Sequence, residues 1–306
     1  MSRLIVLGAG FLGTAVAHAG SARTPTTVID PPFDATLQHR DAAATAALRT
    51  VVAAEQALDG DVAVINACGR ISGTREELHD ANVDFVQWLV DALDGTGARL
   101  VHVGSASEIG DPGTASPVDE SRAAAPVGDY AETKAEATAV VRSAAGSGLH
   151  AVVARVFNVV GPTVPAGSPL SGWLSEIQAL PDDGGTVEVW WPDTTRDFVH
   201  VDDVAGSLID LASVDPASVD TAVVDTASGP SLVNVCTGTG LRFGDIVSAL
   251  ADALGRTVQV RSLDRPGIEC VVGDPSLLVE LTGAAPTMTL ERLASTVARG
   301  MVAGAG

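Results

Sequence analysis

Short apolar segments alternate with longer amphipathic ones along the first half of the chain. The first of them, Leu4-Ile5-Val6-Leu7, is a continuous apolar run that ends in a glycine turn, as expected for a strand buried on both faces of a parallel sheet. The predicted strands are 4–7, 26–29, 62–65, 100–103 and 151–154. Between them, helices are predicted over 11–19, 41–58, 81–93 and 127–145. The helix over 81–93 has the clearest pattern, since its apolar residues recur at spacings of three and four.

This alternation predicts an α/β fold in which right-handed crossovers produce a doubly wound parallel sheet. The pattern changes after Asn158, where glycines and prolines become frequent and three of the four tryptophans occur. We expect substrate-binding structure there, because irregular segments grafted on a rigid sheet commonly carry binding residues. A helix near 204–212 is expected to return to the sheet, and further helices are expected near 243–254 and 290–302.

Composition and charge exclude several classes of function. The 306 residues include 38 acidic and 18 basic ones, a net charge of −20 that would repel a nucleic-acid backbone. No apolar run approaches the roughly 18 residues of a membrane span. The start at Met1 leads at once into the first strand, so we expect no signal peptide and a cytoplasmic protein. Three widely spaced cysteines without CxxC pairing predict reduced thiols and no metal site.

The first predicted strand is followed by a glycine motif. Gly8, Gly10 and Gly13 form GxGxxG at the start of a predicted helix, and Asp30 closes the next strand. In that context the glycines let the backbone approach a pyrophosphate, and the carboxylate accepts hydrogen bonds from a ribose. Asp30 also favours NAD over NADP, because it would repel a 2′-phosphate. The alternative interpretation is an ordinary glycine-rich turn.

A second candidate motif contains the single tyrosine and the single lysine of the chain. Tyr130 and Lys134 lie one helical turn apart on a predicted helix, so both side chains project from the same face. A nearby ammonium favours the phenolate, so Tyr130 can exchange a proton with a substrate hydroxyl. A contact on a solvated helix face is the alternative, but the position after a dinucleotide motif favours catalysis. Arginine supplies the other 17 basic residues, which suggests that position 134 requires an ammonium.

Ordered motifs along nearly the whole chain resemble the extended short-chain dehydrogenase/reductase family, in its group of NAD-dependent nucleotide-sugar epimerases and dehydratases. The similar segments are GAGFLG (8–13), INACG (65–69), VGSASEIG (103–110), YAETK (130–134), RVFNVVGP (155–162) and RDFVHVDDVA (196–205). The resemblance implies a Rossmann-type NAD-binding domain with a smaller C-terminal substrate-binding lobe. The expected domain comprises 1–157 plus about 198–225, and the expected lobe comprises 158–197 plus about 226–306.

The resemblance also implies roles for individual residues. Ser105 would hydrogen-bond the reacting oxygen, Tyr130 would be the base or acid, and Lys134 would hold the nicotinamide ribose. The implied cofactor-binding set is Gly8, Gly10, Phe11, Leu12, Gly13, Asp30, Ala67, Cys68, Gly69, Asn82, Tyr130, Lys134 and Phe157. The implied substrate-binding set is Ser105, Ser107, Asn158, Arg196 and Arg265, the arginines binding a diphosphate.

Departures from the family pattern narrow the reaction. Ser105 is followed by Ala106 and Ser107, whereas the 4,6-dehydratases carry Asp and Glu there. Because elimination of water needs that acid and base, a dehydratase is not expected. We predict an NAD-dependent epimerase acting on a nucleotide sugar through a transient keto-sugar. The alternatives are a net ketoreductase or dehydrogenase and a non-catalytic NAD-binding protein. A decarboxylase is also an alternative, because a one-residue shift aligns Ser107 and Glu108 with the Ser-Glu of decarboxylating members.

Two expectations concern surfaces outside the motifs. Family members often dimerise through a helix bundle that includes the YxxxK helix, so a homodimer is expected. Ala135, Thr138 and Ala139 are small residues expected on the exposed face of that helix. Trp190 or Trp191 could cover a base or a sugar, although the core of the lobe is the alternative place for them.

Overall fold

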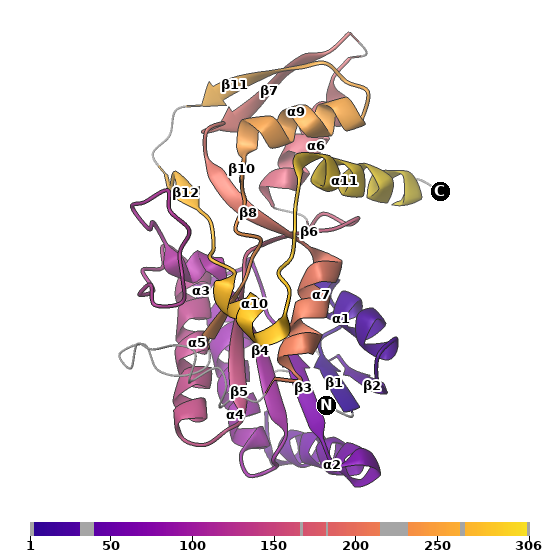
Figure 1. Ribbon diagram of the computed structural model, residues 1–306, viewed down its shortest axis with the longest axis vertical. Helices are drawn as coiled ribbons and strands as arrows, with labels where there is room; N and C mark the ends of the chain where they lie inside the picture. Colours follow the sequence, from indigo (N-terminus) through magenta and orange to yellow (C-terminus); the bar gives the residue numbers. More distant parts are fainter. Residues whose placement is uncertain are drawn as a thin grey trace.

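The computed structural model describes residues 3–30, 40–165, 168–181, 183–214, 232–263 and 267–304. Strands and helices alternate through the first half of the chain (Figure 1). They are β1 (Arg3–Leu7), α1 (Phe11–Ser21), β2 (Thr26–Ile29), α2 (Ala42–Asp59), β3 (Val62–Asn66), α3 (Arg75–His79), α4 (Phe85–Leu93), β4 (Arg99–Ser105), α5 (Asp129–Gly146) and β5 (Ala151–Val156). No helix within the described residues is long and apolar enough to cross a membrane.

A six-stranded parallel sheet forms the centre of the molecule, in the order β2-β1-β3-β4-β5-β9, where β9 is Leu232–Val235. The doubly wound α/β class is therefore confirmed. Alternate residues of a strand point to opposite faces, so burial of both faces requires continuous apolar runs. In β1, Leu4 and Val6 belong to the core on one face, whereas Ile5 and Leu7 belong to the core on the other.

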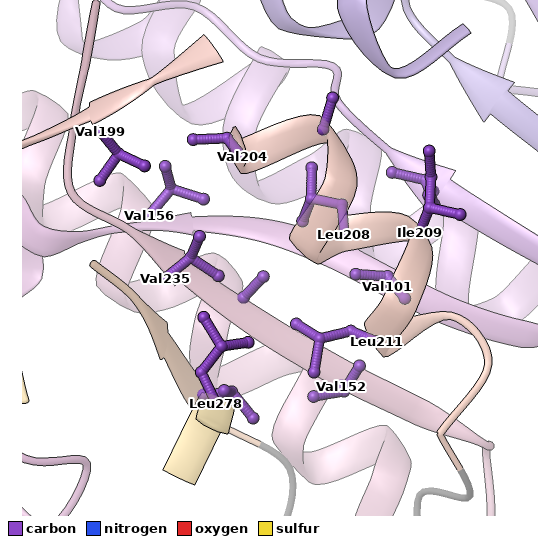
Figure 2. Close-up of a cluster of buried hydrophobic side chains, with 14 of the residues drawn as sticks. Val101, Val152, Val156, Val199, Val204, Leu208, Ile209, Leu211, Val235 and Leu278 are labelled. Carbon is purple, nitrogen blue, oxygen red and sulfur yellow. The ribbon is translucent and has the colours of Figure 1, made fainter. Parts of the chain in front are cut away.

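Helices cover both faces of this sheet. On one face α2, α4 and α5 contribute apolar side chains to a common core. On the other face the core includes α7 (Val201–Leu211) and α10 (Ser276–Thr282). Figure 2 shows strand residues Val101, Val152, Val156 and Val235 beside the α7 residues Val204, Leu208, Ile209 and Leu211. The carboxyl ends of the strands remain free of these layers, and the predicted motifs follow them.

A second unit with its own apolar core adjoins that edge (Figure 1). Its helices are α6 (Pro169–Ala179), α9 (Phe243–Ala253) and α11 (Leu290–Gly304), which share a core with β7 (Gly185–Trp190). The strand β7 pairs in parallel with β11 (Val258–Leu263). A further sheet contains β8 (Thr195–His200), which pairs with β6 (Asn158–Val160), β10 (Gly240–Arg242) and β12 (Cys270–Val271).

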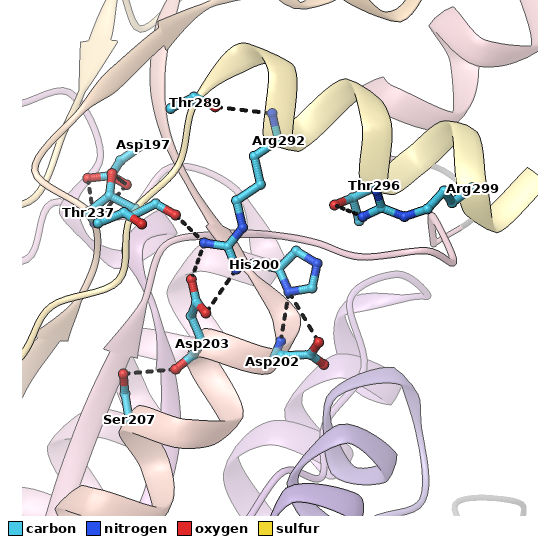
Figure 3. A network of polar contacts seen from close by, with 11 residues as sticks. Asp197, His200, Asp202, Asp203, Ser207, Thr237, Thr289, Arg292, Thr296 and Arg299 are labelled. Atoms are coloured by element: carbon cyan, nitrogen blue, oxygen red, sulfur yellow. Dashed lines mark hydrogen bonds and ion pairs between the residues drawn. The ribbon is translucent and has the colours of Figure 1, made fainter. Parts of the chain in front are cut away.

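Polar contacts fasten this unit to the layer of helix α7. Arg292 of α11 makes a bidentate ion pair with Asp203 of α7, with N–O distances of 2.6 and 3.0 Å (Figure 3). Buried Asp197 at the middle of β8 accepts hydrogen bonds from the backbone N–H groups of Thr237, Gly238 and Gly273. These contacts fix the unit around the carboxyl edge of the sheet.

Some expected boundaries differ from the structure. Strand β9 and helix α10 were expected in the substrate-binding lobe, but β9 pairs with β5 in the central sheet and α10 packs against β9 and α7. The helix expected to begin at Ala81 is the end of a longer helical stretch that begins at Arg75, because Thr74 caps it with a capping box. Residues 80–84 form a π-helical turn within that stretch. The proposed boundary near 225 lies outside the described residues.

Candidate active site

The glycine motif lies between the end of β1 and the start of α1. Gly8 has a φ of +98°, a conformation that residues other than glycine rarely adopt. A Cβ on Gly13 would lie 2.0 Å from the carbonyl oxygen of Gly8, so the helix can approach the loop this closely with glycine alone. The backbone conformation at Gly8 and the close packing at Gly13 therefore require glycine at both positions, whether or not a ligand binds.

Gly10 has no such explanation within the protein. Its φ of −73° suits any residue, and a Cβ there would meet no described atom within 4 Å. The space beside it, at the N-terminus of α1, fits a pyrophosphate that must approach the backbone closely. The glycine motif thus fits the NAD expected from the sequence.

The neighbouring strand ends converge on this loop. The Asp30 carboxylate accepts a hydrogen bond of 3.0 Å from the N–H of Ala9. At the end of β3, the side chain of Asn66 accepts a hydrogen bond of 3.1 Å from the N–H of Cys68. Burial raises the pKa of the Cys68 thiol, which also senses the charges of Asp30 and Lys134. These two charged groups therefore lie near the same strand end, although they are more than 100 residues apart in the sequence.

Ser105 and Tyr130 meet at the end of β4. The Tyr130 and Ser105 side chains line the same cavity, and Ser105 lies close enough to the phenol to affect its pKa. The Ser107 hydroxyl lies 2.9 Å from the Ser105 Oγ and donates to it. Burial raises the pKa of Tyr130, and the side chain of Ser105 opposes that increase. Both serines thus line the cavity with the phenol, and Ser105 is the one whose side chain affects the pKa of Tyr130.

Lys134 is buried on the inner face of α5. Its Nζ donates a hydrogen bond of 2.6 Å to the carbonyl oxygen of Val103 on β4. Burial lowers the pKa of Lys134 to about 8, and the carboxylate of Glu108 opposes that decrease. Among the contacts of the described residues, no hydrogen bond joins Lys134 to Tyr130. The ammonium is held beneath the site, two residues before Ser105 along β4.

A cavity of about 580 Å³ joins the motifs. Its lining includes eight of the predicted site residues, namely Phe11, Leu12, Ser105, Ser107, Tyr130, Phe157, Asn158 and Arg196. Most of the remaining lining is apolar, and among the described lining residues Arg196 carries the one charged side chain. The structure therefore brings the predicted catalytic pair and predicted cofactor and substrate residues to one cavity.

Arg196 and Asn158 are held at the lobe side of this cavity. The Arg196 guanidinium donates to the carbonyl oxygen of Ile268 at 2.9 Å and lies 5.7 Å from the ring centre of Phe243. The Asn158 amide donates a hydrogen bond of 2.8 Å to the carbonyl oxygen of Asp197. Arg265, the other expected diphosphate ligand, lies outside the described residues.

Several predicted residues lie apart from the cavity lining. Asn82 is buried in the π-helical turn, where it hydrogen-bonds both the backbone of Arg70 and the hydroxyl of Thr133. The expectation that Thr138 lies on the exposed face of α5 was wrong, since it is buried against Glu108. Trp190 is exposed, and neither Trp190 nor Trp191 lines the cavity.

Two buried polar residues near the site were missed. Glu108 is fully buried behind Ser105, and Asn66 pairs with His102 between β3 and β4 at 3.1 Å. A polar residue at the end of an apolar strand could have indicated Asn66. Glu108 follows a short polar segment, which gave no indication of burial.

Comparisons with known proteins place the chain in a family. Residues 4–219 match the model of the NAD dependent epimerase/dehydratase family. The chain is 31% identical over 209 residues to dTDP-6-deoxy-L-talose 4-dehydrogenase (NAD(P)(+)) of Kitasatospora kifunensis. That match covers 66% of this chain and 62% of the relative.

Solved structures show the same fold over almost the whole chain. One is UDP-glucose-4-epimerase from Stenotrophomonas maltophila with bound NAD and formylated UDP-arabinopyranose, with a TM-score of 0.77, 20% identity and coverage of 100% of this chain and 99% of that chain. Another is UDP-N-acetylglucosamine 4-epimerase from Methanobrevibacter ruminantium M1 in complex with UDP-N-acetylmuramic acid, with a TM-score of 0.77, 21% identity and 99% coverage of each chain. The resemblance predicted from the motifs is confirmed, and the chain belongs to the NAD-dependent epimerase/dehydratase family.

Proposed function

We propose that the protein is a nucleotide-sugar epimerase that oxidises a ring hydroxyl, most simply at C4, and reduces the ketone from the opposite face. The observation that carries this proposal is the presence of Ser105 and Tyr130 in the lining of one cavity, where Arg196 is the one charged residue among the described lining residues. A dehydratase would need a further acid and base facing the substrate. Among the described lining residues, no aspartate, glutamate or histidine supplies them.

The position of Glu108 argues against decarboxylation. In the shifted alignment Glu108 would correspond to the active-site glutamate of decarboxylating members. Its side chain is fully buried and does not line the cavity. Ser105, which lines the cavity with Tyr130 and opposes the increase in its pKa, is therefore the better candidate for binding the reacting oxygen, with Ser107 supporting it through a hydrogen bond.

In the proposed mechanism Tyr130 removes the proton of the sugar hydroxyl as the ring carbon is oxidised. It returns the proton when the keto-sugar, after rotating in the cavity, is reduced from the opposite face. Bound NAD would supply the hydride acceptor and donor, and its positive nicotinamide would favour the phenolate. Ser105 orients the reacting oxygen through its hydroxyl. Gly8, Gly10 and Gly13 would hold the pyrophosphate, and Arg196 would bind the substrate diphosphate.

A net dehydrogenase or ketoreductase is the second candidate. The relative from Kitasatospora kifunensis is named as a 4-dehydrogenase of a dTDP-linked 6-deoxy sugar, which favours this candidate. The two reactions differ in redox balance, since an epimerase regenerates its cofactor in each turnover. Stoichiometric consumption of added NADH would establish the reductase instead.

The experiment begins with thermal-shift screening of UDP, GDP, CDP and TDP sugars, followed by product analysis for those that stabilise the protein. We expect an epimeric nucleotide sugar without net change in NADH. Tyr130→Phe should reduce kcat at least about 100-fold, because general acid–base catalysis contributes that much or more. Normal turnover by Tyr130→Phe would overturn the mechanism.

We also propose a homodimer that packs through α4 and α5. A surface groove of about 660 Å³ lies between these helices and includes the exposed Ala139. An arginine at Ala139 should shift the mass measured by light scattering from dimer to monomer. An unchanged mass would contradict this interface.

A further inference from the structure

A buried carboxylate behind the site joins the elements that carry the proposed catalytic residues. One oxygen of Glu108, Oε1, accepts a hydrogen bond of 2.8 Å from the backbone N–H of Ser105. The same oxygen accepts a hydrogen bond of 3.0 Å from the hydroxyl of Thr138. Glu108 is fully buried and Thr138 nearly so. Glu108 therefore contacts Ser105 without reaching the cavity itself.

These two hydrogen bonds connect the end of β4 to helix α5. Ser105 is the last residue of β4, and it forms a capping box with Glu108. The Ser105 Oγ also accepts a hydrogen bond of 3.2 Å from the Ser107 N–H. Thr138 follows Lys134 by one helical turn and Tyr130 by two turns on α5. Movement of α5 against β4 would change the distance between the Ser105 and Tyr130 hydroxyls, so a clamp at this point fixes their alignment.

We propose that Glu108 is a positioning residue that holds Ser105 against Tyr130 by clamping β4 to α5 through one carboxylate oxygen. This rests on the proposed function, because it takes the Ser105–Tyr130 pair as the proton-transfer site. Reacting groups must be held within a fraction of an ångström of the productive geometry, and buried hydrogen bonds behind them commonly supply this rigidity.

The surroundings of Glu108 show why the side chain keeps this place. Burial raises its pKa, and the opposing charges come first from Arg155 and then from Lys134. Arg142 senses the charge of Glu108 as well. The second oxygen, Oε2, lies 3.9 Å from the Nε of buried Arg155 on β5. A buried carboxylate surrounded by cations and two hydrogen-bond donors has a fixed orientation.

Glu120 provides a matched control. It is also a largely buried carboxylate near Arg155, and burial also raises its pKa. Its Oε1 accepts a hydrogen bond of 2.7 Å from the N–H of Asn234 on β9. Among the described contacts, none joins Glu120 to Ser105 or to α5. Variants at Glu120 therefore disturb a similar charge without disturbing the clamp.

The test uses the fact that Tyr130 is the single tyrosine of the chain. Its ionisation can be followed by ultraviolet difference absorbance of the apoprotein within milliseconds of an alkaline pH jump, before unfolding. Glu108→Ala and Glu108→Gln both remove the carboxylate charge, but glutamine keeps an oxygen acceptor. The difference between these two variants therefore excludes the effect of the charge and contains the hydrogen-bond clamp together with the packing of the side chain.

We expect the Tyr130 pKa to be higher in Glu108→Ala than in Glu108→Gln by at least about half a unit, a threefold change in the ionisation constant, because a misaligned Ser105 no longer stabilises the phenolate. In a Ser105→Ala background the two variants should give the same Tyr130 pKa. The corresponding Glu120 pair should show no difference in either background.

Equal values for the two Glu108 variants, or a difference that persists without Ser105, would overturn the proposal. If Glu108→Ala does not fold, Thr138→Val removes one bond of the clamp and leaves the charge, and it should raise the Tyr130 pKa while Ser105 is present and not in its absence. The titration needs no substrate, so its outcome is separate from a failure to find epimerase activity. With an active substrate, Glu108→Ala should lower kcat about tenfold or more with little change in KM, and Glu108→Gln should restore most of it.

Discussion

Replacement of Gly10 by alanine separates the requirements of the cofactor from those of the fold. An alanine Cβ at this position meets no described protein atom within 4 Å, and the backbone conformation suits alanine. Two effects on the free energy of unfolding, each about 0.5 kcal/mol, oppose one another. Alanine is a less favourable N-cap residue than glycine, but it reduces the entropy of the unfolded chain. The stability of the apoprotein should therefore change by less than about 0.5 kcal/mol.

The affinity for NAD should fall sharply. The added methyl group lies where the pyrophosphate must approach the backbone, and overpacking of this kind costs about 2 kcal/mol, which weakens binding roughly 30-fold. At an NAD concentration 100 times the wild-type Kd, the ligand stabilises the wild type by about 2.7 kcal/mol and the variant by about 0.9 kcal/mol. At roughly 2 °C per kcal/mol, the thermal shifts should be about 5 °C and 2 °C.

Gly13→Ala is the matched control in a thermal-shift assay with and without NAD. Its Cβ would lie 2.0 Å from the carbonyl oxygen of Gly8, so the apoprotein itself should lose about 2 kcal/mol or more. The reasoning is refuted if Gly10→Ala keeps the full NAD-induced shift. It is equally refuted if Gly10→Ala lowers the Tm of the apoprotein as much as Gly13→Ala does.

Three further predictions concern charged residues. Arg196→Ala should weaken binding of a nucleoside diphosphate about tenfold or more by calorimetry, whereas alanine at the exposed Arg242 should not. The protein should bind NADH more tightly than NADPH, and Asp30→Ala should narrow that ratio; tighter binding of NADPH by the wild type would contradict the role of Asp30. Burial lowers the pKa of Lys134 from 10.5 to about 8, so between these pH values the unfolded chain binds more protons than the native one. The free energy of unfolding of the wild type relative to Lys134→Met, measured by urea denaturation, should therefore rise by roughly 3 kcal/mol between pH 8 and 10.5. If the difference in the free energy of unfolding between the two proteins does not change with pH, the pKa of Lys134 is not lowered in the native state.

Local patterns in the sequence were sufficient to predict the first five strands of the central sheet and the helices between them. The apolar runs and the glycine motif act through neighbouring residues, so their consequences can be read without tertiary information. The resemblance implied roles for Ser105 and Tyr130 at one reacting oxygen, and the structure places both residues at one cavity. Their catalytic roles stay predictions.

Tertiary packing explains what the sequence could not predict. Thr138 has the size and polarity of a surface residue, yet it is buried, and its hydroxyl donates a hydrogen bond to the carboxylate of Glu108. The burial of Glu108 itself depends on Arg155, which lies 47 residues further along the chain. Strand β9 was missed as a sheet strand because its partner β5 precedes it by more than 70 residues. None of these partners is recognisable from local periodicity.

The place of β9 has a consequence for the order in which the chain acquires structure during synthesis. Strand β5 ends at Val156 and β9 begins at Leu232, so the segments of the second unit from β6 to β8, followed by helix α7, emerge from the ribosome between two adjacent strands of one sheet. Until β9 has been synthesised, the edge of β5 has no partner strand, and unpaired edges promote intermolecular association. A nascent chain that stops at residue 219, where the family match ends, would expose this edge and should depend on chaperones more than the full chain does.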